Sequence, residues 1–350
     1  MKKIAYGVLP FLLLSSPAIA EDTSYPNISG EISIEIENDW THDSDDEAAE
    51  INDLYPTVDL VTTFAFTPEL SANLEATLES IDETSEDREF DDLGAYISVL
   101  TVNYDTDAFS VYAGKFGANF GIAWDAAPGL GWGNLADDYE IAEVIGFGGA
   151  VNFNLSGEHS LSGSVFFADT SFLSDSLGDS RGPLEKSDGG PANTESLESF
   201  ALALDGGFDA LEGFRYHIGF ASLEEGEDGD TNQLGYALGA EYEIQLNDEF
   251  TLTPIGEIAF LEDAGGVSGD DIFYGTAGAT LGYNNWSFTT SYHYRDTDSG
   301  GTSVEDYYAD ATIGYEFDFG LFVAAGYRFA EEDDVDSRIL GVLINYTFEF

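Results

Sequence analysis

The residues of this chain that could carry chemistry are four histidines and a large number of acids. The histidines are His42, His159, His217 and His293, and they are scattered along the sequence. No Ser–His constellation of the kind used in nucleophilic catalysis stands out. The run 146–149, Gly-Phe-Gly-Gly, lies in a strand-like stretch and is not a phosphate-binding loop. We therefore expect no enzymatic activity and no cofactor.

Acidic runs are the remaining candidates, because Ca²⁺ and Mg²⁺ prefer carboxylate oxygens as ligands. Residues 224–230 and 331–334 are two such runs, and neither has the spacing of an EF-hand loop. Residues 296–300 come closer, but Tyr307 stands where the twelfth position needs Glu. Ca²⁺ or Mg²⁺ binding at the acidic loops and solvated, mutually repelling loops remain two alternatives. The metal ligands, if any, are unknown.

The charge of the chain excludes several classes of partner. Among 350 residues there are 68 acids and 10 Lys or Arg, which gives a formal net charge of -58. A chain this acidic repels nucleic acid. Aromatic residues make up 14% of the chain, whereas disordered acidic chains are poor in aromatics. The sequence thus predicts an ordered fold, and without cysteine it has to be stable without disulfides.

The first twenty residues are typical of a secretory signal peptide. Lys2 and Lys3 precede an apolar run at 4–14 that is too short to span a bilayer. Residues 17–20, Pro-Ala-Ile-Ala, end in a small-x-small cleavage pattern. We expect cleavage after Ala20, which leaves 21–350 as a single domain. No later apolar run is long enough for a transmembrane helix.

The elements that must position the acids are strands, because alternation of period two recurs along most of the chain. In 28–37, Ile and Gly occupy the even positions while Ser and Glu occupy the odd ones. Sixteen such segments are expected, the last being 338–350, which ends on Phe350. Short connections alternate with long ones, and 119–144, 169–196, 296–305 and 330–337 are among the long ones. This organisation predicts an all-β, sixteen-stranded transmembrane antiparallel barrel in the outer membrane.

Acids that fall on strands share the polar parity of their strand. A charge on the lipid face costs about 2–4 kcal/mol for Arg or Lys at mid-bilayer and less for an acid. The polar face must be wet, because unpaired carboxylates are too costly in a dry core. Sixteen strands enclose an aqueous channel. The acids expected on the pore wall are Glu31, Glu35, Glu75, Glu79, Glu241, Glu243 and Asp310.

Few basic residues share the interior with these acids. Arg215, Arg295 and Arg328 fall on the inward parity of their strands. Two interpretations stay open: they partner nearby carboxylates, or they face an acidic constriction across the lumen. The parity of Lys115 is undecided, because Phe109 and Val111 compete with the stripe that contains Phe116.

The third long connection, 119–144, is too apolar for an exposed loop. It contains Trp124, Leu130, Trp132 and Leu135, which it could bury by folding inward against the barrel wall. In this feature the chain resembles the trimeric Gram-negative general diffusion porins, whose third loop narrows the barrel. The run 128–133, Pro-Gly-Leu-Gly-Trp-Gly, loosely resembles that family's Pro-Glu-Phe-Gly-Gly motif. The resemblance covers the architecture of the whole mature chain.

The resemblance implies a site and a function. It implies that Arg215, Arg295 and Arg328 form the basic side of a pore constriction. The acidic side would be Asp125, Asp137, Asp138, Glu140 and Glu143.

The function it implies is passive diffusion of small hydrophilic solutes through a water-filled channel. Because the loops and lumen are acidic, we expect the channel to attract cations and exclude anions. The protein would be a homotrimer in contact with outer-membrane lipid and lipopolysaccharide.

Two other functions stay open. One is a substrate-specific channel, for which Tyr274, Tyr308 and Phe322 supply a thin inward aromatic track. The other is an occluded barrel that acts as a structural or adhesive surface protein. A soluble acidic β-sandwich would also explain the alternation.

Overall fold

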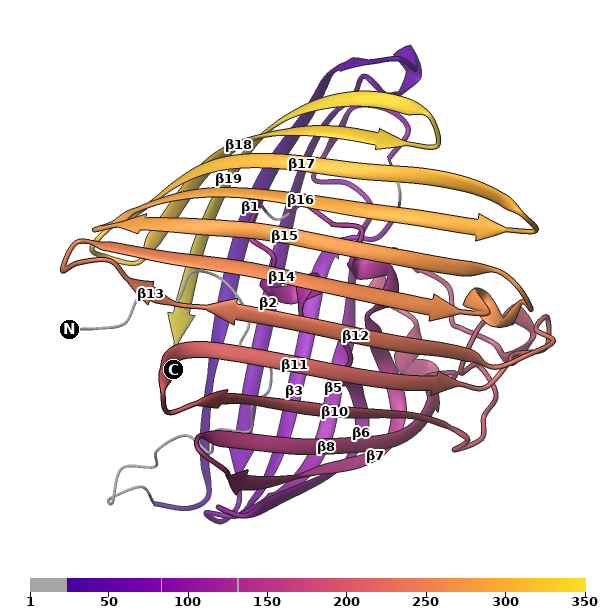
Figure 1. The fold of residues 1–350 in the computed structure, drawn as a ribbon, viewed down its shortest axis with the longest axis vertical. Coiled ribbons are helices and arrows are strands. Elements are labelled where there is room, and N and C mark those ends of the chain that lie inside the picture. The colour runs from indigo at the N-terminus through magenta and orange to yellow at the C-terminus, as the bar shows by residue number, and fades with distance from the viewer. Residues whose placement is uncertain (1–23, 83, 131) are drawn as a thin grey trace.

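One closed antiparallel sheet forms the protein (Figure 1). The computed structural model describes residues 24–350 apart from 83 and 131, so the predicted signal peptide at 1–20 lies outside the described residues. Sixteen barrel strands run through this part of the chain, and β12 and β13 are two pieces of one of them. The barrel strands are β1 (Asn27–Ser44), β2 (Asn52–Ala65), β3 (Leu70–Ser80), β5 (Leu93–Asp105), β6 (Phe109–Ala118), β7 (Ile141–Asn154), β8 (Glu158–Ala168), β10 (Ser199–Phe208), β11 (Leu211–Leu223), β12 (Gln233–Tyr242) with β13 (Ile244–Gln245), β14 (Phe250–Glu262), β15 (Asp271–Tyr283), β16 (Trp286–Ser299), β17 (Thr302–Glu316), β18 (Leu321–Glu332) and β19 (Val335–Glu349).

The first and last barrel strands pair and close the sheet. β1 and β19 run antiparallel with Ile34 opposite Tyr346. Gly30 and Phe350 exchange two backbone hydrogen bonds, of 3.1 and 2.9 Å, at the end of this pair. A closed sheet leaves no strand edge unpaired. The predicted sixteen-stranded antiparallel barrel is therefore confirmed.

Alternation divides each strand between the two faces of the wall. Ile34 and Ile36 on β1, and Val342 and Ile344 on β19, are exposed on the outside of the barrel. Glu37 follows Ile36 on β1, is 1% exposed and points inward. Successive side chains of a strand point to opposite faces of the sheet. The alternating sequence therefore places the apolar residues outward and the polar residues inward. No described helix is long and apolar enough to cross a bilayer.

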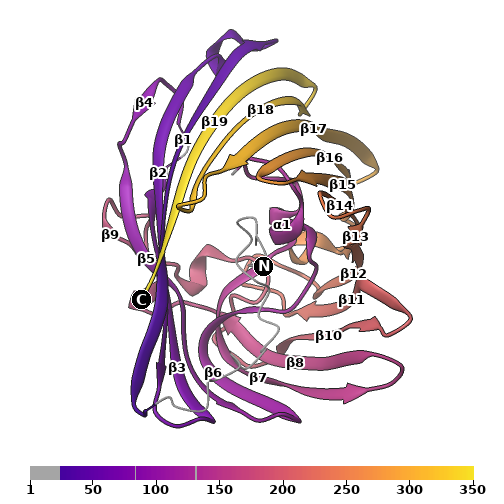
Figure 2. The same cartoon turned by 90° about the vertical axis from the view of Figure 1, so that its left-hand side faces the viewer.

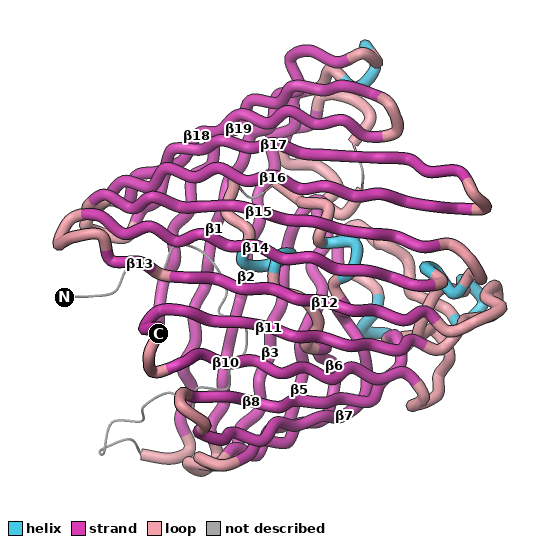
Figure 3. The backbone as a smooth tube through the Cα atoms, viewed as in Figure 1, coloured by secondary structure: helices cyan, strands magenta, loops and turns pink. Residues whose placement is uncertain are grey.

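Loops and short helices gather at one end of the barrel, which we call the long-loop end (Figure 3). The other end has tight turns throughout. Two of the predicted long loops are wrong: β16 and β17 meet in a turn at 300–301, and β18 and β19 meet at 333–334. The alternation of 296–305 and 330–337 continues into the strands. Charged residues on both faces hid this extension, because strands beyond the bilayer no longer need an apolar face.

The wall has a seam between β5 and β6. β3 pairs with β5 from Leu93 to Tyr104, but β6 pairs with it only from Leu100 to Asp105. The short strand β9 (Leu177–Gly178), from the loop after β8, pairs with Gly94 and Ala95 and fills part of the vacant edge (Figure 2). β4 (Arg88–Glu89) adds a short parallel pairing to β2. The seam is thus closed by residues distant in sequence.

Lys115 of β6 lies at the seam and is 2% exposed. Its ammonium group is 2.7 Å from Glu143, 2.8 Å from Asp169 and 2.8 Å from the carbonyl oxygen of Leu173. It pairs across the sheet with Leu100, which is exposed on the outer face, so its position follows the outward parity. The loop after β8 covers Lys115, so this outward position holds a buried cation and not a lipid-facing apolar residue. The alternation around Lys115 therefore could not show which face it occupies.

Candidate pore constriction

Residues 119–140, which we call loop 3, connect β6 to β7 inside the barrel. Figure 2 shows α1 (Ala123–Ala126), part of loop 3, within the ring of strands. The apolar side chains of loop 3 are buried against the wall: Phe120 is 1% exposed and Leu135 3% exposed. Burial of these side chains keeps the loop inside, because exposing them to the water of the lumen would be unfavourable.

Glu257 of β14 holds the start of loop 3. Its carboxylate accepts hydrogen bonds from the backbone N–H groups of Ile122 and Ala123, at 2.8 Å each, and from the Tyr139 hydroxyl at 2.6 Å. Glu257 is 3% exposed. Bonds to a charged acceptor are about twice as strong as neutral ones. One wall carboxylate therefore holds both ends of the loop's compact region.

A second anchor lies next to the first. The Gly121 N–H donates to Nε2 of His217 at 3.0 Å, and Nδ1 of His217 contacts Asp205 at 2.7 Å. The Asn119 amide donates to the other oxygen of Asp205 at 2.8 Å. With Nε2 as the acceptor, Nδ1 carries the proton and donates to Asp205. His217 thus has a positioning role, and sequence analysis assigned it none.

The tip of loop 3 docks on β18, β19 and β1. The Trp132 indole N–H donates to Asp39 at 2.5 Å, and Leu130 and Trp132 pack against Ala324 and Leu343. Glycine is needed at Gly341, because a Cβ there would lie 2.4 Å from the Trp132 ring. Loop 3 therefore follows the inner wall from β6 round to β1.

Arg328 lies beneath this tip and not on an open wall. Its guanidinium makes a bidentate pair with Asp310 at 2.7 and 2.8 Å and donates to the Gly133 carbonyl at 2.7 Å. It is 6% exposed, and it stacks on Trp132 at 4.9 Å from the ring centroid. Arg328 and Asp310 lie on the inner wall, where parity predicts them, but loop 3 covers both, so they do not border the open lumen.

The other two predicted wall arginines are also paired. Arg295 contacts Asp138 of loop 3 at 2.7 Å and Asp306 at 2.8 Å. Arg215 pairs with Glu241 at 2.5 Å. It lies toward the short-turn end and its side chain is 64% exposed. The three arginines partner local carboxylates, and the structure does not bring them together into one basic cluster.

Glu143 belongs to the seam. β7 begins at Ile141, so Glu143 lies on a strand, where it pairs with Lys115 and with Arg181 at 2.5 Å. Glu243 lies between β12 and β13, and its N–H donates to the Gly213 carbonyl. Both are therefore peripheral to the acidic face of loop 3.

The acidic face of loop 3 is formed by Asp125, Asp137 and Glu140, together with Asp138 beside Arg295. Loss of hydration inside the barrel raises the pKa of Asp125 to about 7. The same cause, with repulsion from Asp137 and Asp125, raises the pKa of Glu140 to about 7. The pKa of Asp137 is raised to about 6, although the Asn134 N–H opposes the shift. These groups gain charge across the neutral pH range.

Five more carboxylates stand on the wall formed by β1, β2 and β3. Asp59 of β2 pairs with Ser33 of β1 and Thr77 of β3. Residues two positions away from each partner lie at the diagonals, about 7–8 Å from Asp59. These diagonal positions are occupied by Glu31, Glu35, Glu75 and Glu79.

Hydrogen bonds to this group come from neutral donors. Thr77 donates to Asp59 at 2.7 Å, Tyr96 to Glu79 at 2.5 Å and Asn345 to Glu35 at 3.4 Å. In the described residues, none of the five forms an ion pair with Lys or Arg. The bonds that anchor loop 3 reach β8, β10, β11, β14, β15, β16 and β18, and β1 only at Asp39. No described bond ties loop 3 to the five carboxylates, and we therefore call their wall uncovered. We call these five residues the β1–β3 carboxylates.

Metal ligation was left open by the sequence. Among the residues that the structure describes, no group of three or more His, Asp or Glu side chains is arranged to hold a metal ion. Binding of Ca²⁺ or Mg²⁺ by the acidic loops stays a prediction.

Comparison with known proteins identifies the fold. No family model and no curated protein matches the sequence. Three solved structures that match over most of their length are Acinetobacter baumannii OccAB2 (12% identity, TM-score 0.56, 94% of this chain and 100% of that one), the outer membrane channel DcaP of A. baumannii (13%, 0.59, 92% and 96%) and Pseudomonas aeruginosa OpdK with vanillate (10%, 0.57, 93% and 99%). The chain shares the barrel fold of these proteins, of which DcaP is named as an outer membrane channel. The resemblance to general diffusion porins stays a prediction.

Proposed function

We propose that the protein is a passive channel of the outer membrane, through which small hydrophilic solutes and cations diffuse. The observation that carries this proposal is the uncovered wall with its five β1–β3 carboxylates, none of which forms an ion pair with Lys or Arg in the described residues. Arg181, stacked on Tyr96 next to Glu79, is the cation that acts on this group electrostatically. Loop 3 presents Asp125, Asp137 and Glu140 inside the same barrel. Fixed charge of one sign in a lumen attracts counter-ions and repels co-ions. The channel is therefore cation-selective.

The test is the reversal potential of the purified, full-length mature protein in a planar bilayer under a KCl gradient. Stepwise conductance with K⁺ preferred over Cl⁻ is the expected result. A matched comparison is the double variant Glu31→Gln and Glu75→Gln, which removes two charges from the uncovered wall and leaves every described anchor of loop 3 intact. Anion preference, or an unchanged reversal potential in this variant, would contradict the assignment of the wall.

A substrate-specific channel is the second candidate. It is favoured by the solved structure of OpdK with vanillate and by a cavity between loop 3 and the inner wall that plain diffusion does not use. An unaltered K⁺ conductance in the presence of a bound solute would argue against this candidate. A partial or full block by that solute would support it.

Assembly is part of the proposal. We carry forward the homotrimer implied by the porin resemblance, surrounded by outer-membrane lipid and lipopolysaccharide. Native mass spectrometry from detergent tests the trimer, and a monomer at all concentrations would remove it from the proposal.

A further inference from the structure

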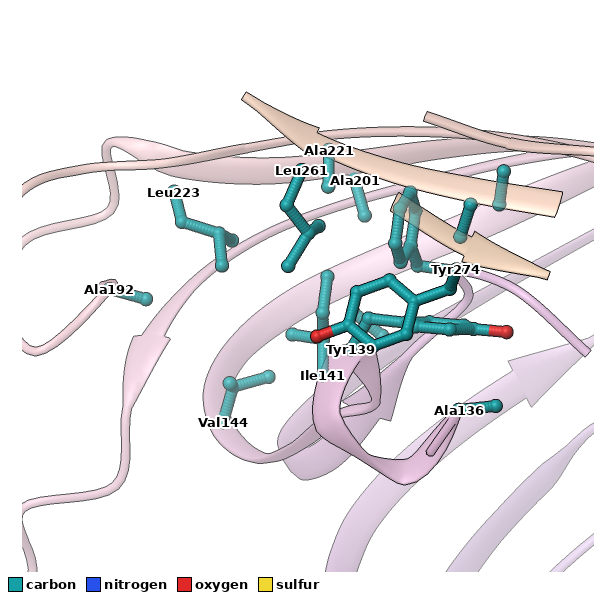
Figure 4. Close-up of a cluster of buried hydrophobic side chains, with 14 of the residues drawn as sticks. Ala136, Tyr139, Ile141, Val144, Ala192, Ala201, Ala221, Leu223, Leu261 and Tyr274 are labelled. Atoms are coloured by element: carbon teal, nitrogen blue, oxygen red, sulfur yellow. The ribbon is translucent and has the colours of Figure 1, made fainter. Parts of the chain in front are cut away.

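A cavity of about 460 Å³ lies between loop 3 and the inner wall near the long-loop end. Phe120, Tyr139 and Ile141 line it from the side of the loop and the start of β7, and Ala221 and Leu261 line it from β11 and β14. Figure 4 shows Tyr139 and Ile141 beneath Ala221 and Leu261. A cavity of this volume suits a small organic ligand. The apolar side chains that line it also dock loop 3 on the wall. The space that they leave open between them is one that passive diffusion does not need.

At the edge of the cavity, the charge that is not already in an ion pair is negative. Asp138, Glu140 and Arg295 line it there. Arg295 is shared among Asp138 at 2.7 Å, Asp306 at 2.8 Å and Glu332 at 3.3 Å. An incoming anion would have to displace one of these carboxylates. Glu140 is exposed and forms no ion pair in the described residues, so it can accept a ligand cation.

Aromatic rings complete the lining. Tyr139 packs edge-on against Tyr274 at 5.0 Å and against Phe120 at 6.1 Å between ring centroids. All three rings line the cavity. Aromatic faces attract ammonium groups and also cover apolar surface. A carboxylate beside aromatic rings and an aliphatic wall is a combination that favours a cation with an apolar body.

We propose that this cavity binds an organic ammonium ion that carries an apolar group, with the ammonium at Glu140 and the apolar group between Tyr139 and Leu261. The ligand's route to the cavity rests on the proposed function, because it enters through the open lumen. The affinity itself does not depend on conduction. The cavity would then act as a collecting site for such cations above the constriction.

Four probes separate the parts of this inference. 2-Phenylethylammonium has both charge and apolar body, ethylammonium has only the charge, 2-phenylethanol has only the body, and phenylacetate reverses the charge. Binding of each is measured by calorimetry or ligand-observed NMR on the full mature protein in detergent. The expected order places 2-phenylethylammonium first, with ethylammonium and 2-phenylethanol weaker and phenylacetate undetected.

Variants locate the site. Glu140→Gln should weaken 2-phenylethylammonium binding about tenfold, as expected for the loss of one ion pair at the edge of the cavity, and leave 2-phenylethanol unchanged. Ala221→Leu should fill part of the cavity and weaken both phenyl compounds, while ethylammonium binds as before. Glu249→Gln, in a turn at the opposite end, is the control for removing one acid and should bind like the wild type.

Each outcome decides the inference separately from the proposed function. Equal binding of phenylacetate, or unchanged binding in both Glu140→Gln and Ala221→Leu, overturns the inference even if the channel conducts K⁺. Binding of 2-phenylethylammonium that both variants weaken sustains it even if bilayers show no conductance, in which case the proposed function fails alone.

Discussion

Two groups of inward carboxylates in this barrel differ in their hydrogen-bond donors. Glu257 and Asp310 are buried under loop 3 and receive N–H or O–H donors or a guanidinium. Glu31 and Glu75 stand on the uncovered wall and receive neither a described hydrogen bond nor an ion pair. A buried carboxylate without donors would be costly, whereas one in a wet lumen is hydrated. The first kind therefore holds structure and the second kind sets the field in the lumen.

Replacing Glu257 with Gln should loosen loop 3. The amide keeps one acceptor oxygen but loses the charge and presents an N–H₂ group to N–H donors. Hydrogen bonds to a charged group are worth about 1.5–3 kcal/mol each, so docking weakens by at least one such bond. We expect a larger and noisier single-channel conductance. Glu75→Gln removes the same charge without touching loop 3 and should stay quiet, and equal noise in both variants would contradict the anchoring role.

Cation selectivity should rise with pH between about 5 and 8. The raised pKa values of Asp125 and Glu140, about 7 for each, mean that both are largely neutral at pH 5 and charged at pH 8. Neutral carboxyls do not attract K⁺, so the preference for K⁺ grows as pH rises through these values. Reversal potentials at four pH values measure this change. The Asp125→Asn, Glu140→Gln double variant should flatten the curve, and a flat curve in the wild type would refute the effect.

At the scale of elements, the barrel is a continuous wall except at the seam between β5 and β6. β6 leaves the edge of β5 at Leu100 to enter loop 3, and β9 takes up part of the edge it leaves. The ion cluster of Lys115, Glu143 and Asp169 links β6 and β7 to the loop that carries β9. In this barrel, loop 3 enters the lumen and the loop after β8 pairs with part of the β5 edge that is left free.

Lys115→Met should destabilise the barrel at this seam. The variant leaves Asp169, 2% exposed, without its cation, whereas Glu143 keeps Arg181. Removing one partner of a buried ion pair costs about 3–5 kcal/mol. We expect a lower temperature for the shift in electrophoretic mobility that marks barrel unfolding. Adding Asp169→Leu should recover part of the loss, and an unchanged transition in Lys115→Met would show that the cluster is not needed.

The strands could be predicted from sequence and the seam could not. Alternation in residues such as Ile34 and Glu35 reflects a contrast between lipid and water that acts on every strand. Lys115 sits where a distant loop replaces lipid, so its local pattern carries no signal. The same limit applies to the site: parity placed Glu257 and Arg328 inside the barrel, but only the path of loop 3 decides that both are covered. Gly341 leaves room for Trp132 of loop 3. The sequence shows the glycine, but its purpose is recognisable only once Trp132 is known to lie against it.

At the scale of the whole molecule, acidic charge dominates the field. The chain carries a formal net charge of -58. Arg215, Arg295 and Arg328 each form an ion pair with a nearby carboxylate. The charge that acts on a permeating ion is therefore the sum of the β1–β3 carboxylates and the loop 3 acids. Such a field extends across the lumen only when salt is low.

Selectivity should accordingly fall as ionic strength rises. The screening length is about 10 Å at 0.1 M salt and about 3 Å at 1 M. We expect the ratio of K⁺ to Cl⁻ permeability to decrease between KCl gradients centred on these two concentrations. A ratio that does not change would mean that ions touch the carboxylates directly, and the field of the lumen as a whole would then be irrelevant.

The pairing of β1 with β19 has a consequence for the time course of folding. The two strands that close the ring are the first and last of the barrel, so their contact spans nearly the greatest possible distance along the chain. Contacts of this kind form late and slowly. Until then β1 and β19 expose free edges that could pair with other chains. The interval before the ring closes is therefore the stage at which the chain is most exposed to pairing with other copies of itself.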